Sequence, residues 1–154
     1  MNIISFKMAN KIIQIIDGPN LNLTGKRENE IYGNESVNAF LEKIRAQFPH
    51  LDIHYTQNNI EGEIINIIQE CGKTPEKGII INPGGYSHTS VAIADAIRAI
   101  RNTVIEVHIS NVHSREDYRQ KMITGSACKG IISGLGLDSY RTALEFFSGE
   151  LREI

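Results

Sequence analysis

Short apolar runs alternate with amphipathic stretches along most of this chain. Apolar residues dominate KIIQIID at 11–17 and GIIIN at 78–82, and they alternate with polar residues in LDIHYTQ at 51–57. These patterns predict β-strands, and the fully apolar GIIIN is typical of the centre of a parallel sheet. Two further strands are predicted at Val104–Ser110 and Lys129–Ser133.

Amphipathic helices are predicted between these strands. In each, apolar residues recur at the three- and four-residue spacing of one helix face. The predicted helices cover residues 37–48, 61–71 and 140–151, with a short helix around 115–121. Gly72 is predicted to end the second of them, because glycine is favoured just beyond a helix C-terminus.

The predicted helix Thr89–Arg101 differs from the others, because it is apolar on almost all sides. Only Asp95 interrupts its middle. A helix apolar all round is usually buried, and in a small α/β domain this predicts a contact with another subunit.

Five strands alternating with helices predict an α/β fold in which helices cover both faces of a parallel sheet. We expect a flavodoxin-like three-layer sandwich with a five-stranded parallel sheet in the order 2-1-3-4-5. No repeat or linker divides residues 11–154, which are predicted to form a single catalytic domain after an N-terminal extension at residues 1–10.

Composition narrows the class of protein. The chain has 154 residues, 41% hydrophobic and 22% charged, and a net charge of -2, so neither nucleic acid nor an anionic membrane is expected as a partner. No apolar run approaches the roughly 18 residues of a membrane span. Cys71 and Cys128 form no CxxC pattern, which favours a reduced, cytoplasmic protein.

Polar residues gather where the predicted strands end. In open parallel sheets, ligands bind beyond the carboxyl ends of the strands. The segments that follow the first four strands are DGPNLN, TQNN, NPGGYSHTS and HISN. We therefore expect one binding site at this edge of the sheet.

The stretch EVHIS has the clearest local signal for chemistry. Glu106, His108 and Ser110 fall on one face of a strand, where the carboxylate can orient and charge the imidazole. Arg115 and Arg119 are predicted to share a helix face suited to binding a carboxylate. The alternative is an edge strand with a polar outer face followed by a surface charge pair.

The loop at residues 18–34 is about twice as long as a usual strand-to-helix connection. It contains Lys26, Arg27 and Tyr32. A neighbouring cation favours the phenolate form of tyrosine, which is a competent base for a proton α to a carbonyl. The alternative is a solvated basic loop anchored by Tyr32.

The loop NPGGYSHTS joins the central strand to the next helix. Gly84 and Gly85 allow the backbone to approach a ligand closely, and Ser87 or Thr89 is expected to cap the helix. The alternative is a well-capped helix start in which His88 only forms hydrogen bonds.

No metal or Schiff-base site is predicted. His108 and His113 lack the spacing of a convergent ligand pair, and no cysteine accompanies them. No lysine lies at the carboxyl end of a predicted strand, where a desolvated amine would be needed.

Four blocks, in order, carry a resemblance to a known family: GPNLNLTGKRENEIYG, QNNIEGE, NPGGYSHTSVAIADA and EVHISNVHSREDYR. From about Lys11 to Leu151 the chain resembles the type II 3-dehydroquinate dehydratases. The resemblance implies a flavodoxin-like fold and the dehydration of 3-dehydroquinate to 3-dehydroshikimate through an enolate, in the shikimate or quinate pathway. It implies no cofactor and no metal.

The resemblance also implies roles for individual residues. Tyr32 matches the catalytic base and Arg27 the cation that keeps it ionised. His108 matches the general acid, Glu106 its carboxylate partner, and Asn20 an amide near the enolate. The matching substrate-binding positions are Asn82, His88, Asp95, Ile109, Ser110 and Arg119.

Family members commonly form dodecamers built from trimers, in which the residue matching Asp95 reaches a neighbouring site. The chain departs from the family pattern at Asn29, Ile60 and the pair Asp138–Ser139. Two other functions remain open: a flavodoxin-like module binding a nucleotide or flavin, and a scaffold that has lost the chemistry. The role of Arg115 is also left open.

Overall fold

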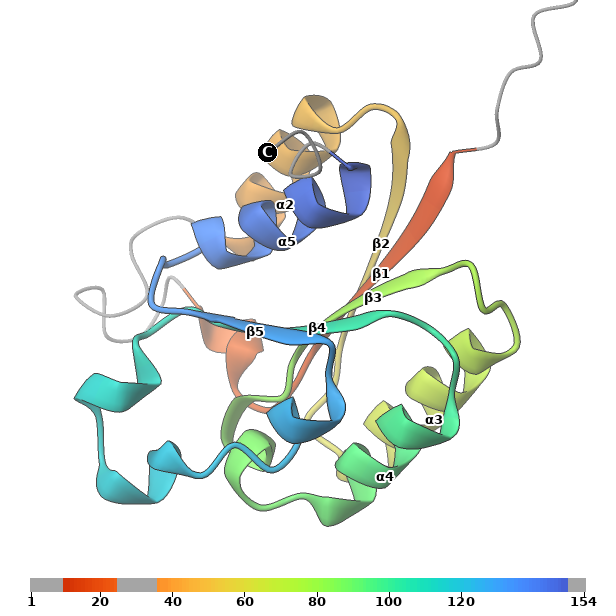
Figure 1. Ribbon diagram of the computed structural model, residues 1–154. Helices are drawn as coiled ribbons and strands as arrows, with labels where there is room; N and C mark the ends of the chain where they lie inside the picture. The colour runs from red at the N-terminus through yellow and green to blue at the C-terminus, as the bar shows by residue number, and fades with distance from the viewer. Residues whose placement is uncertain (1–9, 25–35, 150–154) are drawn as a thin grey trace, which may run out of the picture.

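A five-stranded parallel sheet forms the middle layer of the protein (Figure 1). The computed structural model describes residues 10–24 and 36–149. The predicted fold class and strand order are confirmed, since the order is β2-β1-β3-β4-β5. The strands are β1 (Lys11–Asp17), β2 (Leu51–Gln57), β3 (Gly78–Asn82), β4 (Val104–His108) and β5 (Gly130–Ser133).

Two helices cover each face of the sheet (Figure 1). Helices α2 (Val37–Gln47) and α5 (Asp138–Ser148) lie on one face, and α3 (Glu61–Gly72) and α4 (Val91–Ala99) lie on the other. Among the described residues, no helix is long and apolar enough to cross a membrane.

The central strand β3 is apolar throughout because both of its faces are covered. Successive side chains of a strand point to opposite faces. Ile80 therefore joins the core beneath α2 and α5, whereas Ile79 and Ile81 join the core beneath α3 and α4. All three isoleucines are completely buried.

The start of α4 corrects the predicted cap. The helix begins at Val91 and ends at Ala99, shorter than Thr89–Arg101, and Ser90 caps it by accepting a hydrogen bond from the Ile93 N–H at 2.9 Å. Ser87 lies in the preceding 3-10 turn, Gly84–His88, and Thr89 is the residue that follows this turn. The prediction was wrong because this turn shifts the helix start along the chain.

Other boundaries also differ from the prediction; for example, helix α5 begins at Asp138 and not at Tyr140. Gly72 is the last residue of α3 and not the residue beyond it. Strand β4 ends at His108, so Ser110 follows the strand. The short helix expected at 115–121 is a 3-10 turn at Asp117–Gln120.

A close backbone contact joins the first and third strands at the edge where the site was expected. The Gly18 N–H donates to the Asn82 carbonyl at 2.7 Å. A Cβ atom on Gly18 would lie only 2.5 Å from the carbonyl oxygen of Pro83. Glycine is therefore the residue that lets the loop after β1 lie against the loop after β3.

Candidate active site

A pocket of about 260 Å³ opens at the carboxyl ends of β1, β3 and β4. The segments after these three strands supply its walls, as predicted for an open parallel sheet. The TQNN segment after β2, which was also expected at the site, does not line the pocket. Predicted site residues that line it are Asn20, Asn82, His88, His108, Ile109, Ser110 and Arg119, and Arg115 lines it as well.

Glu106 lies fully buried behind His108. The His108 Nε2 atom is 2.8 Å from Glu106 Oε1. Because a carboxylate only accepts hydrogen bonds, Nε2 carries the proton in this contact, which leaves Nδ1 as the nitrogen free for other partners. Protonated His108 can thus donate a proton from Nδ1 while Glu106 balances its charge.

Two hydroxyl groups and the Cys128 thiol, whose Sγ lies 3.9 Å from Oε2, also surround the Glu106 carboxylate. Ser87 Oγ donates to Oε1 at 2.6 Å, and Thr124 Oγ1 donates to Oε2 at 2.5 Å. A buried carboxylate needs such donors, since burial without them strongly favours the neutral acid. Sequence reasoning missed these roles because both residues lie on other segments, and only the fold brings them to Glu106.

His88 forms the adjoining wall of the pocket. Its ring stacks on that of His108 with a centroid distance of 6.2 Å and an interplanar angle of 23°. His88 Nδ1 lies 2.9 Å from the Lys121 carbonyl, so Nδ1 carries a proton and Nε2 of the neutral ring can accept one. Burial lowers the pKa of His88, which favours this neutral form.

Arg115 and Arg119 provide a cationic wall, although not from one helix face as predicted. The 3-10 turn Asp117–Gln120 begins after Arg115. Glu116 brings the two arginines together, because its Oε2 lies 2.7 Å from Arg119 Nε and 3.5 Å from Arg115 Nε. Both guanidinium groups line the pocket and suit an anionic ligand.

Asn20 has a left-handed backbone, with φ 69° and ψ -4°. Among the described residues it is the one non-glycine residue with positive φ. Its N–H donates to Asn59 Oδ1 at 3.0 Å, which ties the loop after β1 to the loop after β2. Such backbone conformations are uncommon and cluster at functional sites.

Asn82 belongs to a buried series of side-chain hydrogen bonds that sequence reasoning did not identify. Its Nδ2 donates to the Tyr140 hydroxyl at 2.9 Å, and that hydroxyl donates to Asp17 Oδ1 at 2.8 Å. Tyr55 donates to Asp17 Oδ2 at 3.0 Å. Burial raises the pKa of Asp17 to about 7. An acidic residue at the end of a mostly apolar strand was the available signal.

A family model described as dehydroquinase class II matches residues 11–148. The chain belongs to the class II dehydroquinase family. This confirms the family to which the four sequence blocks pointed. It also favours that family over a nucleotide- or flavin-binding module.

Individual class II dehydroquinases are similar to this chain over most of their length. The chain is 48% identical over 141 residues to a 3-dehydroquinate dehydratase of Clostridium botulinum, covering 90% of this chain and 95% of the relative. It is 47% identical over 134 residues to one of Aliarcobacter butzleri, covering 86% and 81%. The crystal structure of the Butyrivibrio crossotus type II dehydroquinase superposes with a TM-score of 0.86 at 41% identity, covering 90% of this chain and 98% of that one.

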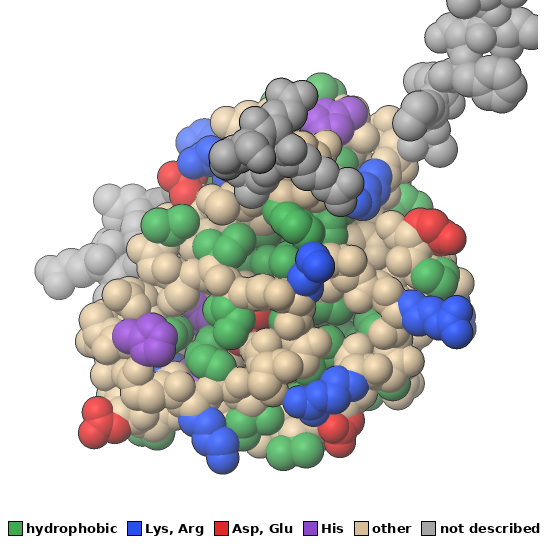
Figure 2. All heavy atoms as spheres, viewed as in Figure 1, with side chains coloured by type: hydrophobic (Ala, Val, Ile, Leu, Met, Phe, Trp, Pro, Cys, Tyr) green, Lys and Arg blue, Asp and Glu red, His purple; other side chains and the backbone are tan. Residues whose placement is uncertain are grey.

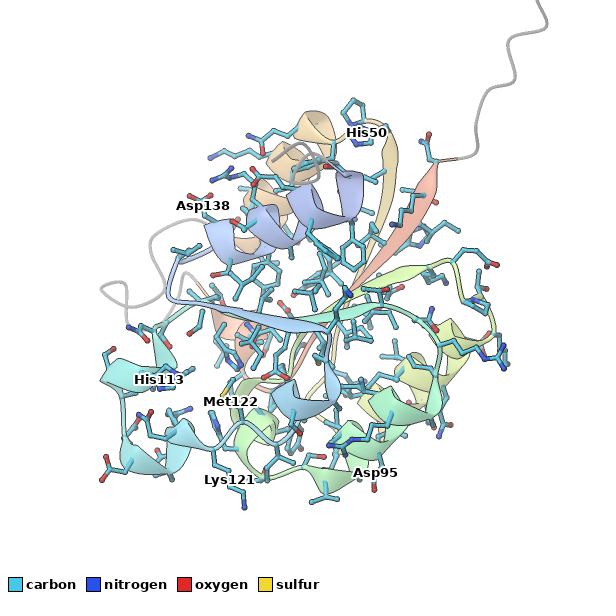
Figure 3. All side chains as sticks on the ribbon, in the orientation of Figure 1. His50, Asp95, His113, Lys121, Met122 and Asp138 are labelled. Atoms are coloured by element: carbon cyan, nitrogen blue, oxygen red, sulfur yellow. The ribbon has the colours of Figure 1, made fainter. Side chains whose placement is uncertain are left out.

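The predicted site residues still to be considered are Arg27, Tyr32 and Asp95. Arg27 and Tyr32 lie outside the described residues, although Thr24, the last described residue before them, lines the pocket. Asp95 lies on the outer side of α4, well apart from His113 beside the pocket loops (Figure 3). Its carboxylate is exposed and pairs with Arg98 at 3.3 Å.

A metal site needs several ligating side chains close together. Within residues 10–24 and 36–149, no group of three or more His, Cys, Asp or Glu side chains could hold a metal ion.

Proposed function

We propose that this class II dehydroquinase dehydrates 3-dehydroquinate to 3-dehydroshikimate, with residues 11–154 as its single catalytic domain. The chain is an enzyme of the type II 3-dehydroquinate dehydratase class, a hydro-lyase. The buried Glu106–His108 pair facing an arginine-lined pocket carries the proposal. The step belongs to the shikimate pathway that leads to chorismate and the aromatic amino acids, and we place the enzyme in the cytoplasm.

The reaction needs a base and an acid on different parts of the substrate. Removing the proton α to the ketone leaves its electron pair in an enolate. The enolate then collapses, the C–O bond of the β-hydroxyl breaks, and that oxygen leaves as water after receiving a proton. His108, protonated and paired with Glu106, is the acid that supplies this proton.

Tyr32 acts as the base in its phenolate form, and Arg27 keeps the phenolate ionised. Both residues lie outside the described part of the chain. The position of Thr24 supports their assignment, because the loop that carries them starts at the pocket wall. The amide of Asn20 stabilises the oxygen of the enolate, where negative charge develops.

The remaining pocket residues bind the substrate. Its carboxylate is held by the backbone N–H groups of Ile109 and Ser110 and by Arg119. Its hydroxyl groups meet Asn82 and His88. This division is supported by the chemistry of the walls, since two arginines line one part of the pocket and amide and imidazole groups line another. A protein with a net charge of -2 needs such a local cluster to bind an anion.

We further propose that the enzyme is a dodecamer built from trimers, in which Asp95 reaches a neighbouring site. Exposed apolar side chains support an assembly: Val91 at the start of α4 is 58% exposed, Leu135 54% and Ile131 on the edge strand β5 44%. Figure 2 shows hydrophobic side chains over the region of β5, with most charged side chains nearer the rim. The carboxylate of Asp95 is exposed on α4, where it pairs with Arg98, and this position would let it face another subunit.

The reaction type is tested by incubating purified protein with 3-dehydroquinate and a metal chelator. We expect a product lighter by one water molecule, and no loss of activity when borohydride is added with the substrate. Borohydride reduces imines, so covalent trapping of substrate on a lysine would contradict the proposed enolate mechanism. Complete loss of turnover with the chelator would contradict the metal-free mechanism.

A further inference from the structure

We propose that Asp17 and Tyr140 are positioning residues that fix which end of the Asn82 amide meets the substrate. The inference rests on the proposed function, in which Asn82 binds a substrate oxygen. It concerns three buried side chains from three separate elements: Asp17 ends β1, Asn82 ends β3, and Tyr140 lies in α5.

The three side chains form a continuous series of hydrogen bonds. The Tyr140 hydroxyl lies 2.8 Å from Asp17 Oδ1, and Asn82 Nδ2 lies 2.9 Å from the Tyr140 hydroxyl oxygen. At the far end, Asn82 Oδ1 accepts the backbone N–H of Gly84 at 3.2 Å. Asn82 is therefore held at both ends of its amide, next to the pocket that it lines.

The direction of these bonds follows from the carboxylate. An ionised carboxylate can only accept, so Tyr140 must donate its hydroxyl hydrogen to Asp17. The phenol oxygen then has only lone pairs to offer to Asn82, and the NH₂ end of the amide must face it. The oxygen end consequently faces Gly84, whose N–H can only donate.

If the Asn82 amide were turned by 180°, acceptor would face acceptor at one end and donor would face donor at the other. The Asn82 oxygen would face the Tyr140 lone pairs, and the NH₂ group would face the Gly84 N–H. Buried groups left without partners are costly, so one orientation dominates. Asn82 therefore presents the second hydrogen of Nδ2 at one fixed place, where it can donate to a hydroxyl or carboxylate oxygen of the substrate.

Tyr55 offers a matched control on the same carboxylate. Its hydroxyl donates to Asp17 Oδ2 at 3.0 Å, whereas the hydroxyl that accepts the Asn82 amide is that of Tyr140. Tyr55→Phe and Tyr140→Phe thus each remove one phenol donor from Asp17. Only Tyr140→Phe also removes the partner that orients Asn82.

The kinetics of these two variants are to be compared at about pH 8, where Asp17 with its pKa of about 7 is largely ionised. We expect both variants to unfold at lower temperature than the wild type. Only Tyr140→Phe should raise KM, by about tenfold with kcat little changed, as expected when uniform binding is lost. Equal KM values for the two variants would overturn the proposal.

A double-mutant cycle tests whether Tyr140 acts through Asn82. Asn82→Ala should raise KM, and adding Tyr140→Phe to it should raise KM no further. Additive losses would refute the coupling. If Tyr140→Phe does not fold, Asp17→Asn takes its place in the cycle, because asparagine keeps the volume of Asp17 but no longer forces the direction of the Tyr140 hydroxyl.

The side-chain NH₂ resonances of Asn82 in ¹⁵N-labelled protein test the orientation without turnover. They should shift strongly in Tyr140→Phe and little in Tyr55→Phe. Similar shifts in both variants would contradict the proposal. A wild-type protein that leaves 3-dehydroquinate unchanged would remove the proposed function, while these spectra would still decide whether Tyr140 orients Asn82.

Discussion

At the scale of single residues, the site depends on the hydrogen-bond donors that stabilise its buried carboxylates. Glu106 accepts hydrogen bonds from Ser87 and Thr124 and lies 2.8 Å from His108 Nε2. Asp17 accepts from two tyrosine hydroxyls in a separate network. The first carboxylate supports a proton donor, whereas the second supports a binding amide. Both depend on hydroxyl donors from distant parts of the chain.

Thr124→Val tests the hydroxyl support of Glu106. Valine keeps the shape of threonine but removes the donor to Oε2, which leaves a buried acceptor short of a partner at a cost of about 1–3 kcal/mol in the free energy of unfolding. We expect kcat to fall about tenfold, because Glu106 then stabilises the charged His108 less well. Steady-state kinetics and urea unfolding measure the two effects.

Thr142→Val is the control for that substitution. The Thr142 hydroxyl donates to the Asp138 carbonyl within α5, remote from Glu106. Its replacement should leave kcat unchanged. A Thr124→Val enzyme with wild-type kcat would show that this hydroxyl does not support catalysis.

Asp17 predicts a particular pH dependence of stability. Its pKa is about 7 in the folded protein and 3.8 as a free side chain, because burial disfavours the charged form. Folding therefore takes up a proton between these values. The stabilisation is fully present below about pH 4 and is lost as the pH rises through 7. Relative to Asp17→Asn, the wild type should lose up to about 1.4 kcal/mol of unfolding free energy per pH unit across this window.

Urea unfolding at several pH values between 4 and 8 measures this slope. Asp95→Asn, which removes an exposed carboxylate, serves as the control and should keep the wild-type slope. If Asp17→Asn also kept the wild-type slope, Asp17 would not be the group that takes up the proton.

At the scale of elements, hydrophobic periodicity predicted the strands and helices, because burial on one or two faces dictates the spacing of apolar residues. GIIIN was recognisable as a central strand for this reason. The cap of α4 was not predictable, since Ser87, Thr89 and Ser90 are all suitable caps and the 3-10 turn before the helix selects Ser90. Likewise, Ser87 turns to Glu106 because the fold brings β4 beside it.

Gly18→Ala tests the close contact between the loop after β1 and the loop after β3. The new Cβ would meet the carbonyl oxygen of Pro83 at 2.5 Å, so one loop must move. We expect a loss of about 1–3 kcal/mol in unfolding free energy and a lower kcat/KM, because Asn20 lies in one loop and Asn82 directly precedes the other. Chemical unfolding and steady-state kinetics measure both.

Gly62→Ala is the matched control. Apart from neighbouring residues and the backbone of α3 itself, no atom lies within 4 Å of the Cβ that it would add, and alanine favours a helix over glycine by up to about 1 kcal/mol. Stability should be unchanged or slightly higher. A Gly18→Ala protein as stable and active as Gly62→Ala would contradict the close packing of the two loops.

At the scale of the whole molecule, one chain places the predicted acid and most of the predicted binding residues in a single pocket. Asp95 is the exception, because it lies on an exposed face of α4. A sequence that represents one chain cannot indicate which subunit completes a site. Its placement in a mostly apolar helix nevertheless pointed to a role outside its own core.

Mixed assemblies test whether Asp95 acts in a neighbouring site. Asp95→Ala and His108→Ala subunits should each have low activity. Unfolding and refolding them together should restore part of it, since a site with an intact His108 can then receive Asp95 from the other kind of chain. Activity no higher than the sum of the separate proteins would contradict a shared site. Sedimentation analysis gives the size of each assembly.

The most direct test of the proposed function is the ultraviolet absorbance of 3-dehydroquinate mixed with wild-type, His108→Ala and His113→Ala proteins. Dehydration creates a conjugated enone, so absorbance should rise with the wild type. It should rise equally with His113→Ala, because His113 is exposed and does not line the pocket. His108→Ala should slow the rise by at least about a hundredfold. No rise at high wild-type concentration, or an unchanged rate with His108→Ala, would contradict the account.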